Sequence, residues 1–247
     1  MARILLVPNP AGKPPVLDWD LFRELIEIAD HIEAASGNLR AAVLTSNSPR
    51  HFMVGANIQV LAELTQQTIG DWVRAGHEAI HRIEALPMPV IARVEGNALG
   101  GGLELALAAD IILAGPGARF GSAEVGLGVV TGHGGAWRLA RRIGFGQARH
   151  MLYTGSIVDG TTAHQMGLCD MHGTGTEVDA WIQQFLDAIR PNSAAAIAET
   201  KAMLLRFDED MREQSCKEES ASSERLIESD DTRNRIQSFL DSRRQPD

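Results

Sequence analysis

Short runs of apolar, often β-branched residues alternate with helix-like segments along the first half of this chain. The runs are Ile4–Val7, Ala41–Leu44, Val90–Val94 and Ile111–Leu113. Runs of this kind, bounded by turn residues, are typical of buried strands. Strands that alternate with helices are joined by crossovers, and crossovers make them mostly parallel. The pattern therefore predicts an α/β fold built on a mostly parallel sheet.

The expected helices carry start and stop signals. Leu21–Ile28 has apolar residues three and four positions apart, and Asp20 is its expected N-terminal cap. A second helix is expected over Trp72–Leu86, where Pro87 and Pro89 would end it. These two segments supply helices between the predicted strands.

The last part of the chain is helical throughout. From about Trp181 the sequence is rich in Ala, Glu, Arg and Leu, with one break at Pro191-Asn192. Asp230-Asp231 is expected to start the last helix. We therefore divide the chain into an α/β core domain, residues 1–190, and a C-terminal helical region, residues 191–247.

The charge balance limits the partners of such a protein. Its 32 acidic and 23 basic residues give a net charge of −9, whereas nucleic acids and anionic membranes attract basic surfaces. No stretch approaches the roughly 20 apolar residues of a membrane helix, and the apolar run near the N-terminus is too short for a signal peptide. The two cysteines are far apart and in no metal-type spacing. We therefore expect a cytoplasmic protein that binds neither nucleic acid nor membrane.

A glycine-rich turn follows the predicted strand Val90–Val94. Gly100-Gly101-Gly102 leads into an Ala/Leu-rich helix, so its backbone N–H groups can stabilise negative charge at the helix start. Glu104 lies in the first turn of that helix, where the helix dipole favours a carboxylate. Glycines alone would indicate only a tight turn, and Glu104 alone only a helix-stabilising residue.

A second carboxylate changes this interpretation. Glu124 follows Phe120-Gly121-Ser122-Ala123, after the short strand that begins at Ile111. A helix, a returning strand and a turn can bring Glu124 to the same end of the sheet as Glu104. Two carboxylates on one water molecule suit general acid–base addition or removal of water.

These segments resemble motifs of the enoyl-CoA hydratase/isomerase (crotonase) family. The paired signature is Ala98–Glu104 with Phe120–Glu124, and His51–Ile58 resembles the F-x-A-G-A-D-I segment of that family. Further matches are the glycine-rich turn of residues 126–139, Ala163 with Gly167-Leu168, and the ending Phe239–Arg244. The resemblance implies a crotonase-like spiral of ββα units followed by a C-terminal helical region.

The resemblance also implies a reaction and roles for residues. It implies an enoyl-CoA hydratase, a lyase that adds water syn to a 2-trans-enoyl-CoA, with no cofactor beyond the coenzyme A thioester substrate. The backbone N–H groups of Val54 and Gly101 would form an oxyanion hole for the thioester oxygen. Glu104 would help deprotonate water, and Glu124 would exchange the proton at the α-carbon. The segment Val54-Gly55-Ala56-Asn57 would line the coenzyme A channel.

The chain also departs from the family pattern. Asn57 stands where Asp is usual, and Thr131 and His133 replace the more common Pro and small residue of the glycine-rich turn. We interpret His133 as a partly exposed loop histidine; the alternative is that it projects toward the acyl pocket and alters substrate choice. Lys13 is interpreted as a solvated loop lysine rather than a phosphate contact.

One short pattern points to different chemistry. His77-Glu78-Ala79-Ile80-His81 spells H-E-x-x-H, which in zinc proteases places two histidine ligands on one helix face. No clear third ligand follows at a suitable spacing, so we attribute the pattern to chance and predict no metal.

Other members of the family keep alternatives open. A double-bond isomerase, a specialised hydratase, a thioester decarboxylase or a hydrolase would use the same fold, and a non-catalytic acyl-CoA-binding subunit would use only the oxyanion loop. The presence of both glutamates favours hydration. By analogy the helical region would assemble the protein as a homotrimer or a dimer of trimers.

Overall fold

Two sheets form the centre of the computed structural model, which describes residues 1–7 and 13–242. The larger sheet is parallel throughout and has the order β1 (Ala2–Leu6), β2 (Ala42–Ser46), β4 (Val90–Val94), β6 (Ile111–Ala114), β9 (Met171–His172). The smaller sheet has the order β3 (His51–Met53), β5 (Asn97–Leu99), β7 (Arg119–Gly121), β8 (Ile157–Asp159). In it only the β7–β8 pair is antiparallel.

The two sheets are built from a repeated unit. β2, β4 and β6 of the larger sheet are each followed by a strand of the smaller one, β3, β5 and β7 respectively, and then by a helical segment. The segments are α2 (Ile58–Glu63), α4 (Gly101–Leu107) and the 3-10 turn η2 (Glu124–Leu127). Because β3, β5 and β7 are parallel neighbours, their carboxyl ends meet at one edge. Three loops predicted to carry function therefore converge there.

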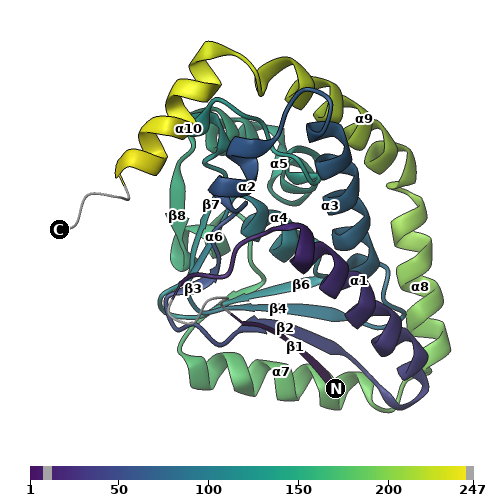
Figure 1. The fold of residues 1–247 in the computed structure, drawn as a ribbon. Helices are drawn as coiled ribbons and strands as arrows, with labels where there is room; N and C mark the ends of the chain where they lie inside the picture. Colours follow the sequence, from purple (N-terminus) through teal and green to yellow (C-terminus); the bar gives the residue numbers. More distant parts are fainter. Residues whose placement is uncertain (8–12, 243–247) are drawn as a thin grey trace.

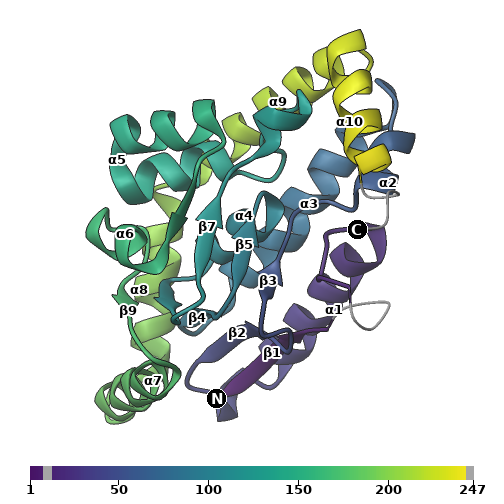
Figure 2. The same cartoon turned by 90° about the vertical axis from the view of Figure 1, so that its left-hand side faces the viewer.

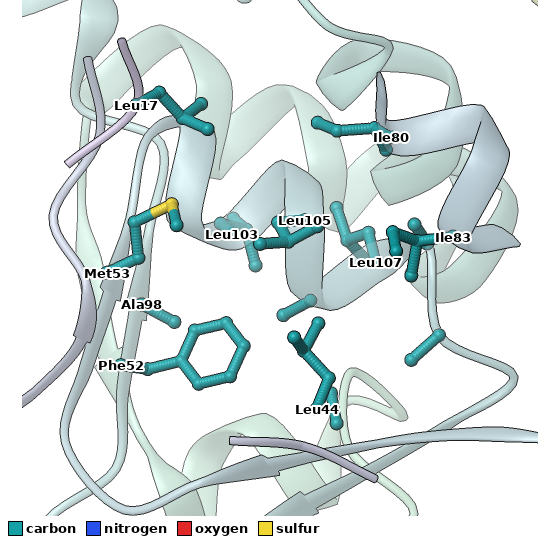
Figure 3. Packing of buried hydrophobic residues seen from close by; sticks show 14 of the residues in the cluster. Leu17, Leu44, Phe52, Met53, Ile80, Ile83, Ala98, Leu103, Leu105 and Leu107 are labelled. Atoms are coloured by element: carbon teal, nitrogen blue, oxygen red, sulfur yellow. The ribbon is translucent and has the colours of Figure 1, made fainter. Parts of the chain in front are cut away.

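The core lies between the sheets and the helices. α4 is buried along its whole length, and Figure 3 shows Leu103, Leu105 and Leu107 of this helix facing Phe52 and Leu44 from the strands. α1 (Trp19–Ala34) and α3 (Ile69–Glu84) cover the same side of the larger sheet (Figure 1). A helix with no exposed face holds its first turn rigidly, and Glu104 lies in that turn.

The opposite side of the larger sheet is covered by α7 (Gly175–Ile189), as Figures 1 and 2 show. Val178 and Ile182 of α7 pack against Val43, Ile91 and Leu113, which belong to the central strands. This second cluster explains why β2, β4 and β6 read as continuous apolar runs, since both of their faces are buried.

The C-terminal helices fold back over the body of the chain. α8 (Ala194–Arg206) and α9 (Glu209–Leu226) run along one side, where α9 packs against α3, and α10 (Asp230–Ser242) lies against α2 and η2 (Figure 1). Along the chain, α5 (Gly135–Thr154) precedes β8 and α6 (Gly160–Gln165) follows it. None of the helices that the structure describes is long and apolar enough to cross a membrane.

The structure contains the predicted strands and helices, but some of the helices begin at other residues than predicted. The predicted strand Val90–Val94 and the start of the last helix at Asp230 are confirmed. The predicted cap Asp20 is wrong: Asp18 accepts the Leu21 N–H at 2.9 Å, because α1 begins at Trp19. α3 starts at Ile69, ahead of the predicted Trp72. Of the C-terminal resemblance, Arg243 and Arg244 lie outside the described residues.

Candidate active site

A cavity of about 630 Å³ lies at the carboxyl edge of β3, β5 and β7. Both predicted acids, Glu104 and Glu124, are part of its lining. Most of the remaining wall is apolar and comes from several elements, with Ile58, Leu61, Ile69, Trp72, Val73, Val129, Ile227 and Phe239 among its residues. A concave, mostly apolar space with a few polar groups is the usual form of a small-molecule site.

Glu104 is held by three donors of a single loop. Its Oε1 accepts the N–H of His133 at 2.8 Å and that of Gly135 at 3.0 Å. Its Oε2 lies 3.1 Å from His133 Nδ1. Burial acts to raise the pKa of Glu104, but the charge interaction and hydrogen bonds with His133 outweigh it and hold the pKa below its ordinary value. Glu104 is therefore a carboxylate with a fixed orientation.

Glu124 has a contrasting environment at the start of η2. Ser122 Oγ donates to its Oε2 at 2.8 Å, while Oε1 is buried and has no hydrogen-bond partner among the described residues. Burial, followed by the negative charge of Glu104, raises the pKa of Glu124 to about 7. Glu104 is thus ionised at neutral pH, while Glu124 is about half protonated there, and two acids with pKa values pushed apart are the pattern of a general acid–base pair.

Glycines leave the space that the two carboxylates occupy. A Cβ atom on Gly135 would lie 2.8 Å from Glu104 Oε1, and one on Gly100 would lie 3.2 Å from Glu124 Oε1. Gly100 also has φ +54°, which side chains rarely adopt. The glycine-rich turns are therefore required by close approach to the acids as well as by chain reversal.

We expect Glu124→Gln to stabilise the protein in alkaline conditions. A carboxyl whose pKa rises from 4.5 to about 7 on folding costs no stability below pH 4.5, and its penalty grows as the pH rises to 7. The free energy of unfolding of the variant should exceed that of the wild type by about 1–3 kcal/mol at pH 8. Near pH 4 the two should agree. Urea unfolding at both pH values measures this, and an equal difference at both would contradict the assigned pKa.

The two predicted oxyanion-hole amides differ in their present partners. Gly101 is the first residue of α4, so its N–H has no partner inside the helix, and it lines the cavity. Val54 also lines the cavity, but its N–H donates to the Pro15 carbonyl at 3.0 Å. Of these two amides, only that of Gly101 is available without displacing another of the described residues.

The residues of the segment predicted to line the coenzyme A channel also differ in their contacts. Gly55 and Ala56 line the cavity, and Gly55 has φ +90°. Their backbone pairs with Leu17, whose N–H donates to the Gly55 carbonyl at 2.8 Å. Asn57 is not part of the lining: its side chain caps α2 by accepting the Gln59 N–H at 3.1 Å. A helix cap accounts for Asn at this position.

The interpretation of His133 as a partly exposed loop residue is wrong. Its relative exposure is 3%, and its ring faces the rings of Phe22 and Trp72 at centroid distances of 5.3 and 5.9 Å. It lines the cavity and contacts Glu104. The sequence could not show this, because the space for the ring comes from α3.

Two residues of the site were not predicted. Ser122 hydrogen-bonds to Glu124, and its hydroxyl two positions before an acid was a usable signal. Glu219 of α9 is buried and accepts the Gly134 N–H at 2.9 Å and the Thr131 hydroxyl at 3.2 Å. It lies on a strongly polar helix, and no local sequence pattern marks it.

The histidines of the H-E-x-x-H pattern have carboxylate partners. His77 Nε2 lies 2.7 Å from Glu219, and His81 Nδ1 lies 3.4 Å from Glu84. Within residues 1–7 and 13–242, no group of three or more His, Cys, Asp or Glu side chains is arranged to hold a metal ion. Lys13 is exposed and is not in the cavity lining.

Comparisons with known proteins identify the family of this chain. The profile of the enoyl-CoA hydratase/isomerase family matches residues 16–247. The Bacillus subtilis protein YngF, named for that family, is 32% identical over 240 residues, which cover 97% of this chain and 92% of YngF. A short-chain-enoyl-CoA hydratase from Clostridium acetobutylicum is 33% identical over 190 residues, 77% of this chain and 72% of that one.

Solved structures show the same architecture. The crystal structure of an enoyl-CoA hydratase from Bacillus halodurans superposes with a TM-score of 0.86 at 21% identity and covers 96% of each chain. This supports the predicted crotonase fold, with its α/β body and C-terminal helices. The chain belongs to the enoyl-CoA hydratase/isomerase family and has the crotonase fold.

Proposed function

We propose that this protein is an enoyl-CoA hydratase that adds water to a 2-trans-enoyl-CoA and gives a 3-hydroxyacyl-CoA. The observation that carries the proposal is the pair of acids in one apolar cavity, with Glu104 ionised and the pKa of Glu124 at about 7. Addition of water needs a base for its proton and an acid for the α-carbon. The apolar wall suits an acyl chain.

The proton transfers balance across the two acids. The Glu104 carboxylate takes a proton from water as the hydroxyl bonds to the β-carbon, and protonated Glu124 gives its proton to the α-carbon. Redistribution of one proton between the acids then restores the starting state. Negative charge that develops on the thioester oxygen would be stabilised by the Gly101 N–H. The Val54 N–H would join it once the thioester oxygen replaces the Pro15 carbonyl as its acceptor.

One observation favours an enoyl-CoA isomerase as the second candidate. Both oxygens of Glu104 already accept hydrogen bonds from the protein, which weakens this carboxylate as a base for water. Glu124 alone, ionised, could carry a proton from C2 to C4 of a 3-enoyl-CoA and so move the double bond. The same cavity and amides would serve that reaction.

The sign of the pH dependence separates the two reactions. Hydration requires one proton on the pair, so kcat/KM should fall about tenfold per pH unit above the Glu124 pKa of about 7. Dehydration should show the same limb, because the overall equilibrium involves no net proton. Isomerisation by ionised Glu124 should instead rise through the same pH. Absorbance of the conjugated thioester, followed from pH 5 to 9 with 2-enoyl and 3-enoyl substrates, measures both.

We also propose that the enzyme works without a cofactor other than the thioester substrate, in the cytoplasm, and as a homotrimer or dimer of trimers. Exposed apolar side chains support the assembly: Met203, Leu204, Phe207 and Met211 of the α8–α9 region are at least 52% exposed in the single chain. Light scattering tests the oligomeric state, and a monomer at micromolar concentration would contradict it.

A further inference from the structure

The His133 ring occupies a space that two helices, α1 and α3, leave for it. A Cβ on Gly76 of α3 would lie 2.0 Å from His133 Cδ2 and 2.3 Å from Nε2. Phe22 of α1 and Trp72 of α3 flank the ring on its other sides. A glycine inside a helix costs about 1 kcal/mol relative to alanine, and here its small size is what admits the imidazole.

This enclosure fixes what the ring offers to Glu104. Nδ1 lies 3.1 Å from Glu104 Oε2. Because a carboxylate can only accept, Nδ1 carries the proton whether the ring is neutral or charged. Among the described residues, no other side chain donates to Glu104; its remaining donors are the amides of His133 and Gly135.

Two other titratable groups also act on this acid. His77 lies on α3, and its electrostatic interaction with Glu104 acts to lower the pKa of that acid. Glu124 lies at the start of η2, where the charges of the two acids repel each other. His77 is itself paired with Glu219 of α9, whose Oε2 lies 2.7 Å from its Nε2. His133 is the only one of these histidines in direct contact with Glu104.

We propose that His133 is a positioning residue: its Nδ1–H holds the Glu104 carboxylate ionised and correctly oriented, and Gly76 holds His133. The inference rests on the proposed hydration only for the kinetic role of Glu104. The contact itself and the dependence on Gly76 concern the protein without substrate. His133 thereby supplies a donor that a small residue at this position lacks.

Two replacements at position 133 separate the donor from the volume. His133→Asn keeps an N–H close to the position of Nδ1, while His133→Leu keeps an apolar side chain of similar size without a donor. With crotonyl-CoA as the probe, we expect His133→Leu to lose about 10- to 100-fold in kcat with little change in KM. His133→Asn should remain within about threefold of the wild type. Equal losses in both variants would overturn the donor role.

A matched glycine pair tests the role of the space. Gly76→Ala should displace the ring and reproduce the loss seen in His133→Leu. Gly70→Ala lies in the same helix, where a Cβ would meet only the flexible ends of Glu224 and Arg74 at 2.8 and 3.2 Å. It should behave as the wild type. Wild-type activity in Gly76→Ala would contradict the proposal, and this variant also covers the case in which His133→Leu does not fold.

A measurement without substrate keeps this inference separate from the proposed function. The pH titration of Glu104, followed by NMR of protein carrying ¹³C-labelled glutamate and assigned with Glu104→Gln, should show a higher pKa in His133→Leu and in Gly76→Ala. His133→Asn and Gly70→Ala should titrate as the wild type. An unchanged titration in His133→Leu would refute the positioning role. If the wild-type protein shows no hydration activity but the titrations change as expected, only the proposed function is refuted.

Discussion

Glu124→Gln should lower kcat for hydration by about 10²- to 10⁴-fold. Glutamine has the shape of protonated glutamic acid, and its amide oxygen can still accept the hydrogen bond that the Ser122 hydroxyl donates to Oε2 of Glu124. It has no proton to give to the α-carbon, so the loss should appear in kcat while KM stays nearly constant. Steady-state kinetics with a 2-trans-enoyl-CoA, in both directions, gives the two constants.

Controls for this variant are available in the same region. Glu63→Gln removes a carboxyl from the exposed end of α2, close to the cavity wall at Leu61, and should leave kcat unchanged. Glu104→Gln should also lose turnover by orders of magnitude, because it removes the base for water. If Glu124→Gln and Glu104→Gln both keep the full rate of hydration, the two-acid mechanism is ruled out.

Arg138→Met should destabilise the protein by about 3–5 kcal/mol. Arg138 is buried and donates to both oxygens of Glu84, from Nε at 3.2 Å and Nη2 at 2.8 Å. Burial acts to raise the pKa of Glu84, but the Arg138 charge, with hydrogen bonds from His81 and Arg138, lowers it to about 2. Removal of the guanidinium leaves a buried carboxylate without its partner, and this is the costly case.

Urea unfolding at pH 7 and a fixed protein concentration measures the loss. Arg190→Met, which removes one member of an exposed pair with Asp187, should change the free energy of unfolding by less than about 1 kcal/mol. The double replacement Glu84→Leu with Arg138→Met should recover most of the loss, because an apolar pair can replace a buried ion pair at little cost. A single variant as stable as the wild type would show that the pair contributes nothing.

The ion pair of Glu84 and Arg138 also predicts that the wild-type protein loses stability in acid. A carboxylate with a folded pKa of about 2 and an ordinary pKa of 4.5 stabilises the fold above pH 4.5, and that contribution is lost as the pH falls toward 2. Arg138 Nη1 also donates to the His133 carbonyl at 2.8 Å. Acid should therefore loosen the loop that holds Glu104 along with the rest of the core.

Sequence reasoning recovered the features that depend on local pattern. The strand Val90–Val94 is a run that a proline precedes, and it was placed correctly. The cap of α1 was expected at Asp20, and the prediction was wrong by two residues because the helix begins at Trp19 and Asp18 caps it. Both acids and the Gly101 amide were brought to one cavity because β5 and β7 are parallel neighbours.

Features that depend on distant partners were not predictable from one sequence. The contact between the Val54 N–H and Pro15 joins two segments that no periodicity relates. The burial of His133 depends on the absence of a side chain at Gly76 in another helix. Glu219 reaches the glycine-rich loop from a helix that reads as solvent-exposed. In each case the deciding information is a distance between elements.

The closing helices have a consequence for biosynthesis. Part of the cavity wall comes from the C-terminal helices: Ser223 lies in α9, Ile227 follows that helix, and Phe239 lies in α10. Glu219 of α9 also accepts the Gly134 N–H. A nascent chain that does not yet include α9 contains both acids but lacks these residues of the wall. We therefore expect the cavity to be enclosed only after α9 and α10 have been translated, and a chain truncated before α9 should leave the cavity open on that side.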